Sequence, residues 1–480
     1  MHGSERRSRF EQQDEVVVMK FGGTSVEDAP AIRRLIAIVH SRGEELPVVV
    51  VSALAKVTDQ LLEAGQAASN GHLGWALANV REIYVRHERL ADELVETAGE
   101  LLQHELRKEF QALEALLHTI AALRQFGLSA QDHLLGFGER LSSRLVTAAL
   151  AASGTTAAHV DASQCIVTDA RHGQAGPEWD LTNQRLQDAL LPLLEQGQVP
   201  VLGGFIASTS EGVPTTLGRG GSDFTAAIVG AAVGAARVEI WTDVDGIMTA
   251  DPKLCPEARV IRRMSFEEAA ELAHFGAKVL HPATLAPAMR ENIPVLVLNS
   301  RNPQAEGTEI TARARTGNSI SAITAKKRVA TVELQPFQSV NSELLSAVYD
   351  AFDEHACPVD VMGTSPGRLS LVVGSTAALP DIADKLRGVA DVRWENHKAL
   401  VCLVGENLRR QPDAASRAFA ALSDLEVKMA CQGASERTIS FLVDESKMEE
   451  SVQRLHAVFF PARRESADWG GASAAFCQAG

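Results

Sequence analysis

The sequence predicts an α/β protein in which helices sandwich a mostly parallel sheet, followed by two smaller α+β modules. Two observations favour this fold class. Up to about residue 298, short apolar runs alternate with longer segments of helical pattern, as in parallel sheets built from strand–helix–strand units. Beyond residue 328, one order of strand, loop, helix, strand, turn and strand occurs twice, with an offset of 70 residues.

Composition excludes several classes of protein. A chain of 480 residues with 45% hydrophobic and 22% charged residues is expected to form two or three globular domains. Its net charge of −15 argues against nucleic acid or an anionic membrane as the main partner. No apolar run reaches the roughly 18 residues of a membrane span, and residues 1–14 are too polar for a secretory signal. The six cysteines form no CxxC pair, so we expect reduced thiols and a cytoplasmic location.

The first predicted strand, residues 15–20, runs straight into a glycine-containing loop, and a helix follows at about residues 30–40. This order is typical of phosphate-binding sites, because a helix N-terminus leaves backbone N–H groups unpaired. Lys20 ends the strand and Gly22 and Gly23 follow it, which makes this lysine a candidate phosphate ligand. The alternative is a strand-end lysine that meets only solvent.

Polar residues follow two further predicted elements. A buried strand at residues 47–51 ends in Ser52, with Thr58 close behind, and ligands of parallel sheets bind beyond the carboxyl ends of the strands. After a helical excursion at residues 59–126, Glu139 lies beside glycines near the start of a helix, where its carboxylate could hold an ammonium group. The alternative for each residue is an ordinary role in a turn or a helix cap.

The run LGRGGSD at residues 217–223 lies between a strand at residues 199–202 and a buried helix at residues 224–236. Its glycines let an anion approach the backbone where the helix begins. Arg219 can clamp a carboxylate or phosphate with two hydrogen bonds. Asp223 would be poorly placed in an anion site unless cationic side chains met it. The alternative is a tight loop with an N-capping acid.

A later strand, residues 237–241, ends in Thr242 and Asp243, which again places polar side chains at the ligand edge. The run FGAKVLHP at residues 275–282 carries a second lysine, Lys278, in a glycine-containing connection. The histidines of this region have no cysteine or histidine partner at ligand spacing, so no metal site is expected.

These observations divide the chain into six expected segments. They are a disordered tail (1–14), a catalytic α/β domain (15–312), a linker (313–328), two α+β modules (329–398 and 399–463) and a loose tail (464–480).

Four motifs in this order resemble those of the aspartate kinases, or aspartokinases, in the amino-acid kinase family. They are KFGGTSV (20–26), LGRGGSD (217–223), WTDVDG (241–246) and FGAKVLHP (275–282). The resemblance covers about residues 15–463 and includes the repeated modules, which resemble a tandem pair of ferredoxin-like ACT domains. It implies a monofunctional enzyme with the amino-acid kinase fold, because the chain is too short to add a homoserine dehydrogenase domain.

The resemblance implies that ATP with Mg²⁺ phosphorylates the β-carboxylate of L-aspartate, the first step of lysine, threonine and methionine biosynthesis. A carboxylate is already ionised at pH 7, so the reaction needs positioning and charge neutralisation, not a general base. The implied catalytic residues are Lys20, Asp223 and Lys278. The implied ATP contacts are Lys20, Gly22, Gly23, Thr242, Asp243, Met248, Lys253, Lys278 and Val279. The implied aspartate contacts are Ser52, Thr58, Glu139, Arg219, Gly220, Gly221 and Ser222.

The paired modules imply feedback control by an amino acid, lysine or threonine, with Asp360 and Ser365 as the allosteric residues, and a homo-oligomer formed through these modules. The sequence departs from the family at Met248, where many members have tyrosine, and at Pro366, where a glutamate is expected. Two alternatives stay open. One is another amino-acid kinase acting on glutamate or acetylglutamate, and the other is a catalytically inactive amino-acid sensor, which the two intact lysines and Asp223 disfavour.

Overall fold

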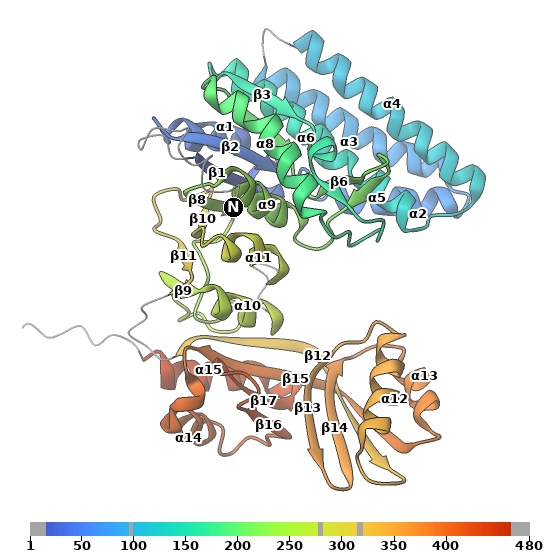
Figure 1. The fold of residues 1–480 in the computed structure, drawn as a ribbon, viewed down its shortest axis with the longest axis vertical. Helices are drawn as coiled ribbons and strands as arrows, with labels where there is room; N and C mark the ends of the chain where they lie inside the picture. The colour runs from blue at the N-terminus through green and yellow to red at the C-terminus, as the bar shows by residue number, and fades with distance from the viewer. Residues whose placement is uncertain (1–15, 96–98, 277–281, 314–319, 462–480) are drawn as a thin grey trace, which may run out of the picture. The chain divides into compact units, whose positions relative to one another are not determined.

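The computed structural model describes residues 16–95, 99–276, 282–313 and 320–461. The chain divides into two compact units (Figure 1). The first contains most of the chain up to Met248 together with Arg259–Ala322 and Val404–Glu406. The second contains Thr249–Ala258, Ile323–Leu403 and the chain from Asn407 onward.

An eight-stranded sheet forms the centre of the first unit, in the strand order β3-β5-β2-β1-β8-β10-β11-β9. Its strands are β1 (Val16–Phe21), β2 (Leu46–Val51), β3 (Ala157–Val160), β5 (Val199–Gly203), β8 (Arg237–Thr242), β9 (Arg263–Ser265), β10 (Val295–Asn299) and β11 (Thr308–Thr311). Neighbouring strands run parallel except for β10 and β11, which are antiparallel. The predicted, mostly parallel sheet is therefore confirmed.

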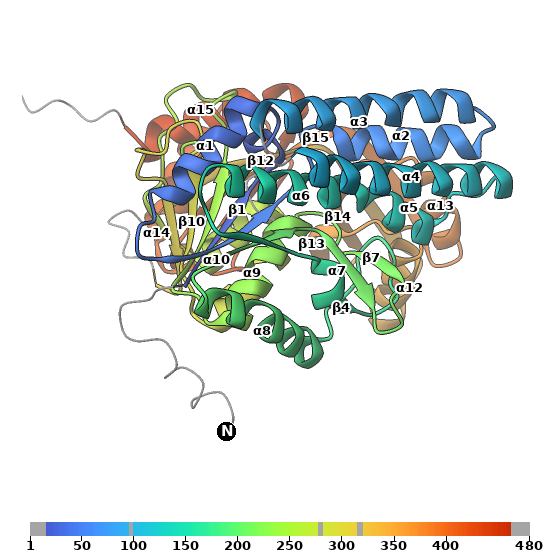
Figure 2. The ribbon, with the colours of Figure 1, turned by 90° about the horizontal axis from the view of Figure 1, so that it is seen from above.

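Helices cover both faces of this sheet, as the view from above shows (Figure 2). Val17, Met19 and Phe21 of β1 pack into one core with α1–α6, and Val16 and Val18 pack into the other core with α8–α11. Successive side chains of a strand point to opposite faces, so a strand buried on both faces must be apolar throughout. The helices are α1 (Ala29–His40), α2 (Val57–Ser69), α3 (Leu73–Leu94), α4 (Gly99–Leu123), α5 (Leu128–Leu135), α6 (Phe137–Ala152), α7 (Ala162–Cys165), α8 (Trp179–Glu195), α9 (Gly221–Val233), α10 (Phe266–His274) and α11 (Pro282–Arg290).

A smaller sheet in the same unit has the strand order β4-β6-β7. Its strands are β4 (Val167–Thr168), β6 (Ile206–Thr209) and β7 (Pro214–Thr216). The last of them leads directly into the glycine-rich run at residues 217–223, so this sheet fixes where that run begins.

The second unit contains a six-stranded sheet in the order β13-β14-β12-β15-β17-β16. Its elements are β12 (Ile320–Pro336), α12 (Ser342–Asp353), β13 (Val359–Ser365), β14 (Arg368–Gly374), α13 (Leu379–Leu386), β15 (Ala390–Gly405), α14 (Pro412–Ala421), β16 (Met429–Gln432), β17 (Thr438–Asp444) and α15 (Met448–Phe459). The repeated order of elements predicted from the sequence is present.

Two expected segment boundaries fall inside strands. The predicted linker, residues 313–328, includes the first half of β12, and the predicted boundary between the modules at residue 398 lies within β15. The richness of this region in Arg, Thr, Gly and Asn predicted a linker, although the buried residues Ile320–Thr324 are well suited to a strand.

The described part of the chain can be compared with what composition predicts about membrane spans and about cysteines. None of the helices in that part is both long and apolar enough to cross a membrane. The cysteines within it are all free thiols, at positions 165, 255, 357, 402 and 431.

Candidate active site

A cavity of about 350 Å³ opens in the first unit, where β1 and β2 end. Ligands of parallel sheets bind at this carboxyl edge. Of the residues predicted from the sequence, nine line the cavity: Lys20, Gly23, Ser52, Thr58, Glu139, Gly220, Gly221, Ser222 and Asp223. Segments that are far apart in the sequence therefore meet around one cavity.

Lys20 and Asp223 form an ion pair at this cavity, with Nζ 2.6 Å from Oδ1. Alternation along β1 places Lys20 on the same face as Val16 and Val18, which is the face that α9 covers. Asp223 lies in the first turn of α9. Only 11% and 14% of the two side chains are exposed, so the carboxylate holds a mostly buried ammonium group in place.

The turn that starts α9 depends on glycine. Gly218 and Gly220 have φ values of 75° and 71°, in the left-handed region that other residues rarely adopt. Gly221 packs against an aromatic ring, because a Cβ added there would lie 2.6 Å from Cδ2 of Phe205. A Cβ added at Gly204 would lie 2.7 Å from Cα of Ser222. The backbone at the helix start is thus held close to the cavity, where its N–H groups can bind an anion.

Glu139 is a buried acid in the first turn of α6, with 3% of its surface exposed. Burial raises the pKa of this carboxyl group from 4.5 to about 8. Its Oε2 atom has no hydrogen-bond partner among the described residues. A buried acceptor without a partner is costly, so a donor such as an ammonium group would be bound favourably here.

The end of β8 lies next to the end of β1, with Phe21 in register with Trp241. The N–H of Gly22 donates to the carbonyl of Trp241 over 3.1 Å, which ties the loop after β1 to β8. Thr242 ends β8, and its hydroxyl lies 3.3 Å from Oδ1 of Asp243. These residues therefore share the carboxyl edge with Lys20 without lining the cavity.

Other predicted ATP contacts lie apart from the cavity or cannot be placed. Met248 forms an isolated β-bridge with Val260 and does not line the cavity. Lys253 belongs to the second unit. Lys278 and Val279 lie outside the described residues.

Arg219 differs from its predicted neighbours. It is exposed at the tip of the turn between Gly218 and Gly220, and it does not line the cavity although both glycines do.

The cavity residues that were not singled out from the sequence include Lys56, Asp59 and Phe205. Lys56 is the N-cap of α2 and Asp59 lies in its first turn, close to the predicted contact Thr58. Lys56 has a φ of 71°, which sequence patterns do not reveal for a lysine. Phe205 is also left-handed, with a φ of 67°, and its N–H donates to Oγ1 of Thr225 over 2.9 Å.

The two predicted allosteric residues lie on β13 in the second unit. The Asp360 side chain is 2% exposed, and both of its carboxylate oxygens lie 2.7 Å from Nζ of Lys326 on β12. Ser365 is exposed, and its hydroxyl donates to the carbonyl of Arg368 over 3.3 Å. An internal ammonium group thus already contacts the carboxylate that was predicted to meet an effector.

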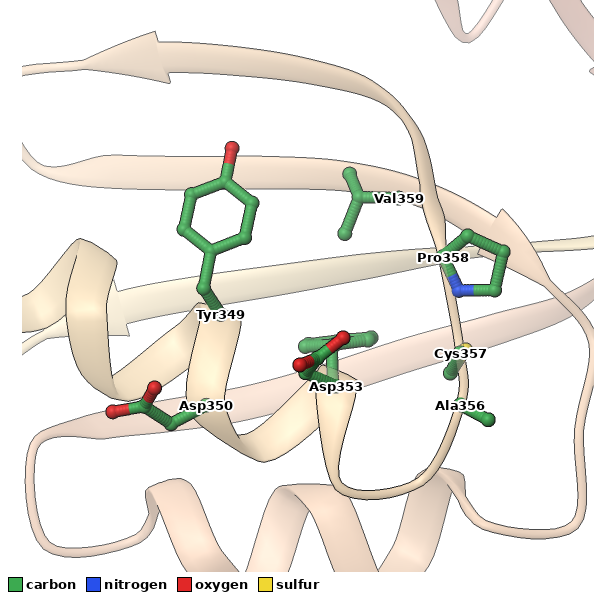
Figure 3. Close-up of a pocket in the computed structure, with 8 residues that line it drawn as sticks. Tyr349, Asp350, Asp353, Ala356, Cys357, Pro358 and Val359 are labelled. Carbon is green, nitrogen blue, oxygen red and sulfur yellow. The ribbon is translucent and has the colours of Figure 1, made fainter. Parts of the chain in front are cut away.

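A second cavity, of about 560 Å³, lies beside α12 and the start of β13 (Figure 3). Its lining includes Tyr349, Asp350 and Asp353 of α12, together with Pro358 and with Val359 at the start of β13. Neither predicted allosteric residue is part of this lining.

Comparison with known proteins defines the class to which this fold and site belong. The model of the amino acid kinase family matches residues 15–299, and an ACT domain model matches residues 401–459. Aspartokinase 3, chloroplastic, of Arabidopsis thaliana is 34% identical over 92% of this chain and 81% of its own length. Lysine-sensitive aspartokinase 3 of Escherichia coli is 34% identical over 93% of this chain and 99% of its own length.

Solved structures give the same result. The crystal structure of E. coli aspartokinase III in complex with aspartate and ADP, described as the R-state, has a TM-score of 0.82 at 33% identity. It covers 93% of this chain and all of that one. The complex of the same enzyme with lysine and aspartate, described as the T-state, has a TM-score of 0.78 at 34% identity and covers the same shares. The chain belongs to the amino acid kinase family and, within it, to the aspartokinases.

Proposed function

We propose that this chain transfers the γ-phosphoryl group of ATP to the β-carboxylate of L-aspartate, giving 4-phospho-L-aspartate and ADP. This reaction opens the biosynthesis of lysine, threonine and methionine. The observation that carries the proposal is a single cavity lined both by the Lys20–Asp223 ion pair and by the buried Glu139, whose Oε2 has no hydrogen-bond partner among the described residues. The complex of the E. coli relative with aspartate and ADP supports it.

The substrate's own charges match the walls of the cavity. The α-ammonium group of aspartate would donate to Glu139, whose Oε2 has no partner among the described residues. Ser52, Thr58 and the backbone at Gly220–Ser222 would donate to its carboxylates. Arg219 would have to turn inward from the exposed tip to add a bidentate contact. The reacting β-carboxylate is ionised at neutral pH, so no side chain has to remove a proton.

The phosphoryl group would pass from the nucleotide to aspartate above the carboxyl ends of three neighbouring strands at the centre of the sheet. In the order β2-β1-β8, Ser52 stands on the aspartate side, Lys20 in the middle, and Thr242 with Asp243 on the nucleotide side. Lys20 would neutralise charge on the transferring group, and Asp223 would keep the ammonium aimed. We propose Met248, Lys253, Lys278 and Val279 as further nucleotide contacts, with Lys278 as a second phosphate cation.

Mg²⁺ would neutralise phosphate charge during the transfer. No group of three or more histidine, cysteine or carboxylate side chains in the described ranges could hold a metal ion. A Mg²⁺ ion that is bound mainly by phosphate oxygens and water, as is usual for this ion in kinases, does not need such a group.

We propose that the second unit confers feedback control on a cytoplasmic homo-oligomer. The support is the ACT domain match and the E. coli relative, which is described as lysine-sensitive and is known in complex with lysine. Lysine or threonine would bind near Asp360 and Ser365 and shift the enzyme by binding one of its states more tightly. Assembly would take place through these modules.

The first test is ADP release from ATP and Mg²⁺ with L-aspartate, L-glutamate or no acceptor, each with and without lysine or threonine. We expect release that depends on aspartate and that falls with one effector. Release with glutamate in place of aspartate would support the other amino-acid kinases instead. A folded protein that releases no ADP with either acceptor would be a sensor.

A further inference from the structure

Lys56 lines the same cavity as Lys20, and the roles proposed above leave it unused. The walls of the cavity carry two lysines, and these differ in their surroundings. Lys20 is held by Asp223, whereas Lys56 is exposed and forms no ion pair with any residue in the described part of the chain. Lys56 is therefore the cation of this cavity that remains available to an anionic ligand.

Two local preferences are broken at Lys56. Its φ of 71° is left-handed, a conformation that costs a residue with a Cβ about 1 kcal/mol and that glycine adopts freely. Lys56 is also the N-cap of α2 and makes no side-chain capping bond. A helix N-terminus carries partial positive charge, so a lysine there is unfavourable unless an anion lies nearby, and the carboxylate in the first turn of α2, Asp59, forms no ion pair with Lys56 in the described part of the chain. Residues that break local rules without a packing reason are expected at functional sites.

Glu139, which also lines the cavity, gives independent evidence that a charged ligand binds here. Oε2 of Glu139 is buried, faces the same cavity and has no hydrogen-bond partner among the described residues. The lining of the cavity thus contains both an acceptor without a partner and a cation at a helix N-terminus. An amino acid that carries both an ammonium group and carboxylates matches this arrangement.

We propose that Lys56 binds a carboxylate of the amino-acid substrate, holding it between its ammonium group and the N-terminus of α2. This inference rests on the proposed function, because it takes aspartate as the ligand of the cavity. Under this proposal the two lysines of the cavity have separate roles. Lys20, fixed by Asp223, serves the phosphoryl group, and Lys56 serves the substrate from the side of β2.

Three variants test this role in the full-length protein. Lys56→Gln removes the charge and should raise KM for aspartate at least about 10-fold, with KM for ATP changing less than about twofold. Lys56→Arg keeps the charge and should keep KM for aspartate within about threefold of the original value. Lys56→Gly should weaken aspartate binding as Lys56→Gln does while raising Tm, because glycine relieves the left-handed backbone.

Arg124 offers a matched control, because it is also an exposed cation with a left-handed φ, 51°, and it does not line the cavity. Arg124→Gly should raise Tm without changing KM for aspartate.

An unchanged KM for aspartate in Lys56→Gln and Lys56→Gly, with an active parent enzyme, would overturn the role of Lys56 and leave the proposed function intact. A parent enzyme without aspartate-dependent ADP release would overturn both. A loss of aspartate affinity in Lys56→Gly together with a lowered Tm would point to local unfolding and would also count against the proposal.

Discussion

The hydroxyl of Thr216 donates a hydrogen bond to Oδ1 of Asp132 over 2.5 Å, and both side chains are buried. The same carboxylate accepts from the backbone N–H of Gly173 at 3.0 Å and lies 2.8 Å from Nδ1 of His172. Asp132 lies on α5, just ahead of the helix that carries Glu139, and Thr216 ends β7, just ahead of the glycine-rich turn. One carboxylate therefore links the segments that lead into Glu139 and into the glycine-rich turn, both of which line the cavity.

Replacing this carboxylate should loosen the substrate pocket. In Asp132→Ala, the buried donors of Thr216 and Gly173 lose their acceptor, which should cost about 1–3 kcal/mol of unfolding free energy each. We expect KM for aspartate to rise more than KM for ATP, because the affected segments carry the proposed aspartate contacts. Asp132→Asn keeps an acceptor for Thr216 and should recover part of the affinity. Equal increases in both KM values would show a general loss of structure instead.

The Lys20–Asp223 pair should behave as a coupled unit. Lys20→Met strands a mostly buried carboxylate and Asp223→Leu strands a mostly buried ammonium, so each should destabilise the protein by about 3 kcal/mol. The double variant removes both charges and should lose less stability than the two single losses added together. All three should lower kcat at least about 100-fold, because charge neutralisation at the phosphoryl group is lost. Urea unfolding and kcat measured on the same samples would reveal this difference, and additive stability losses would contradict the coupling.

Glu139 should make aspartate use depend on pH. Its carboxyl group has a pKa of about 8 in the free protein, yet only the ionised form attracts the substrate's ammonium group. We therefore expect kcat/KM for aspartate to rise with pH up to about 8 and then to level off. Glu139→Gln should have a low kcat/KM that is flat over this range. If this variant keeps the same rise, another group is responsible for it.

Ionisation of Glu139 should also lower the stability of the folded protein as the pH rises. Between pH 4.5 and about 8 the carboxyl group ionises in the unfolded chain but stays protonated in the folded one, so unfolding releases a proton. The contribution of this carboxyl group to the free energy of unfolding is thus greatest below pH 4.5 and decreases as the pH rises toward 8. Glu139→Gln should gain stability over the parent protein at pH 8, and this gain should shrink toward pH 4.5. Tm measured against pH for both proteins is the test.

Gly204 should not tolerate a methyl group. A Cβ there would lie 2.7 Å from the backbone of Ser222, so Gly204→Ala must push the start of α9 away from β5, at a cost of about 1–3 kcal/mol. We expect reduced Tm and weaker aspartate binding. Gly74→Ala is the control, because Gly74 lies within α3 and a Cβ there meets nothing within 4 Å. That variant should be neutral or more stable by about 1 kcal/mol.

Lys326 should compete with an effector for Asp360. Removing its ammonium in Lys326→Met takes away a 2.7 Å contact from a carboxylate that is 2% exposed, so the protein should lose stability. If Asp360 receives an effector's ammonium group, lysine or threonine should then inhibit at about tenfold lower concentration and raise Tm more than in the parent protein. Lys398→Met breaks a comparable 2.7 Å pair with Asp444 and should leave the effector response unchanged. An unchanged response in Lys326→Met would separate Asp360 from effector binding.

Much of the first unit could be predicted because its strands are buried on both faces. The run Val16–Phe21 is apolar throughout apart from Lys20, and a lone cation in such a strand is a strong signal. The glycine-rich turn was predictable because left-handed backbone demands glycine, as at Gly218 and Gly220. Both signals are local in the sequence.

The remaining features depend on long-range packing, which local patterns do not encode. Lys56 is left-handed without being glycine, so its backbone could not be inferred from its type. Arg219 was predicted as an aspartate contact from its guanidinium group and the family resemblance, yet the direction of a side chain at the tip of a turn is not set by residue type. The ion pair of Lys326 with Asp360 joins two strands that are not neighbours in the sheet, β12 and β13.

The alternation along β1 makes the number of its residues as important as their identity. Val17, Met19 and Phe21 face one core, and Val16 and Val18 face the other together with Lys20. Deleting a single residue from the middle of this strand would turn Lys20 toward the opposite helices and away from Asp223. We therefore expect evolution to exchange apolar residues freely within β1 but to reject insertions and deletions there, while the loop at residues 41–45 can change in length.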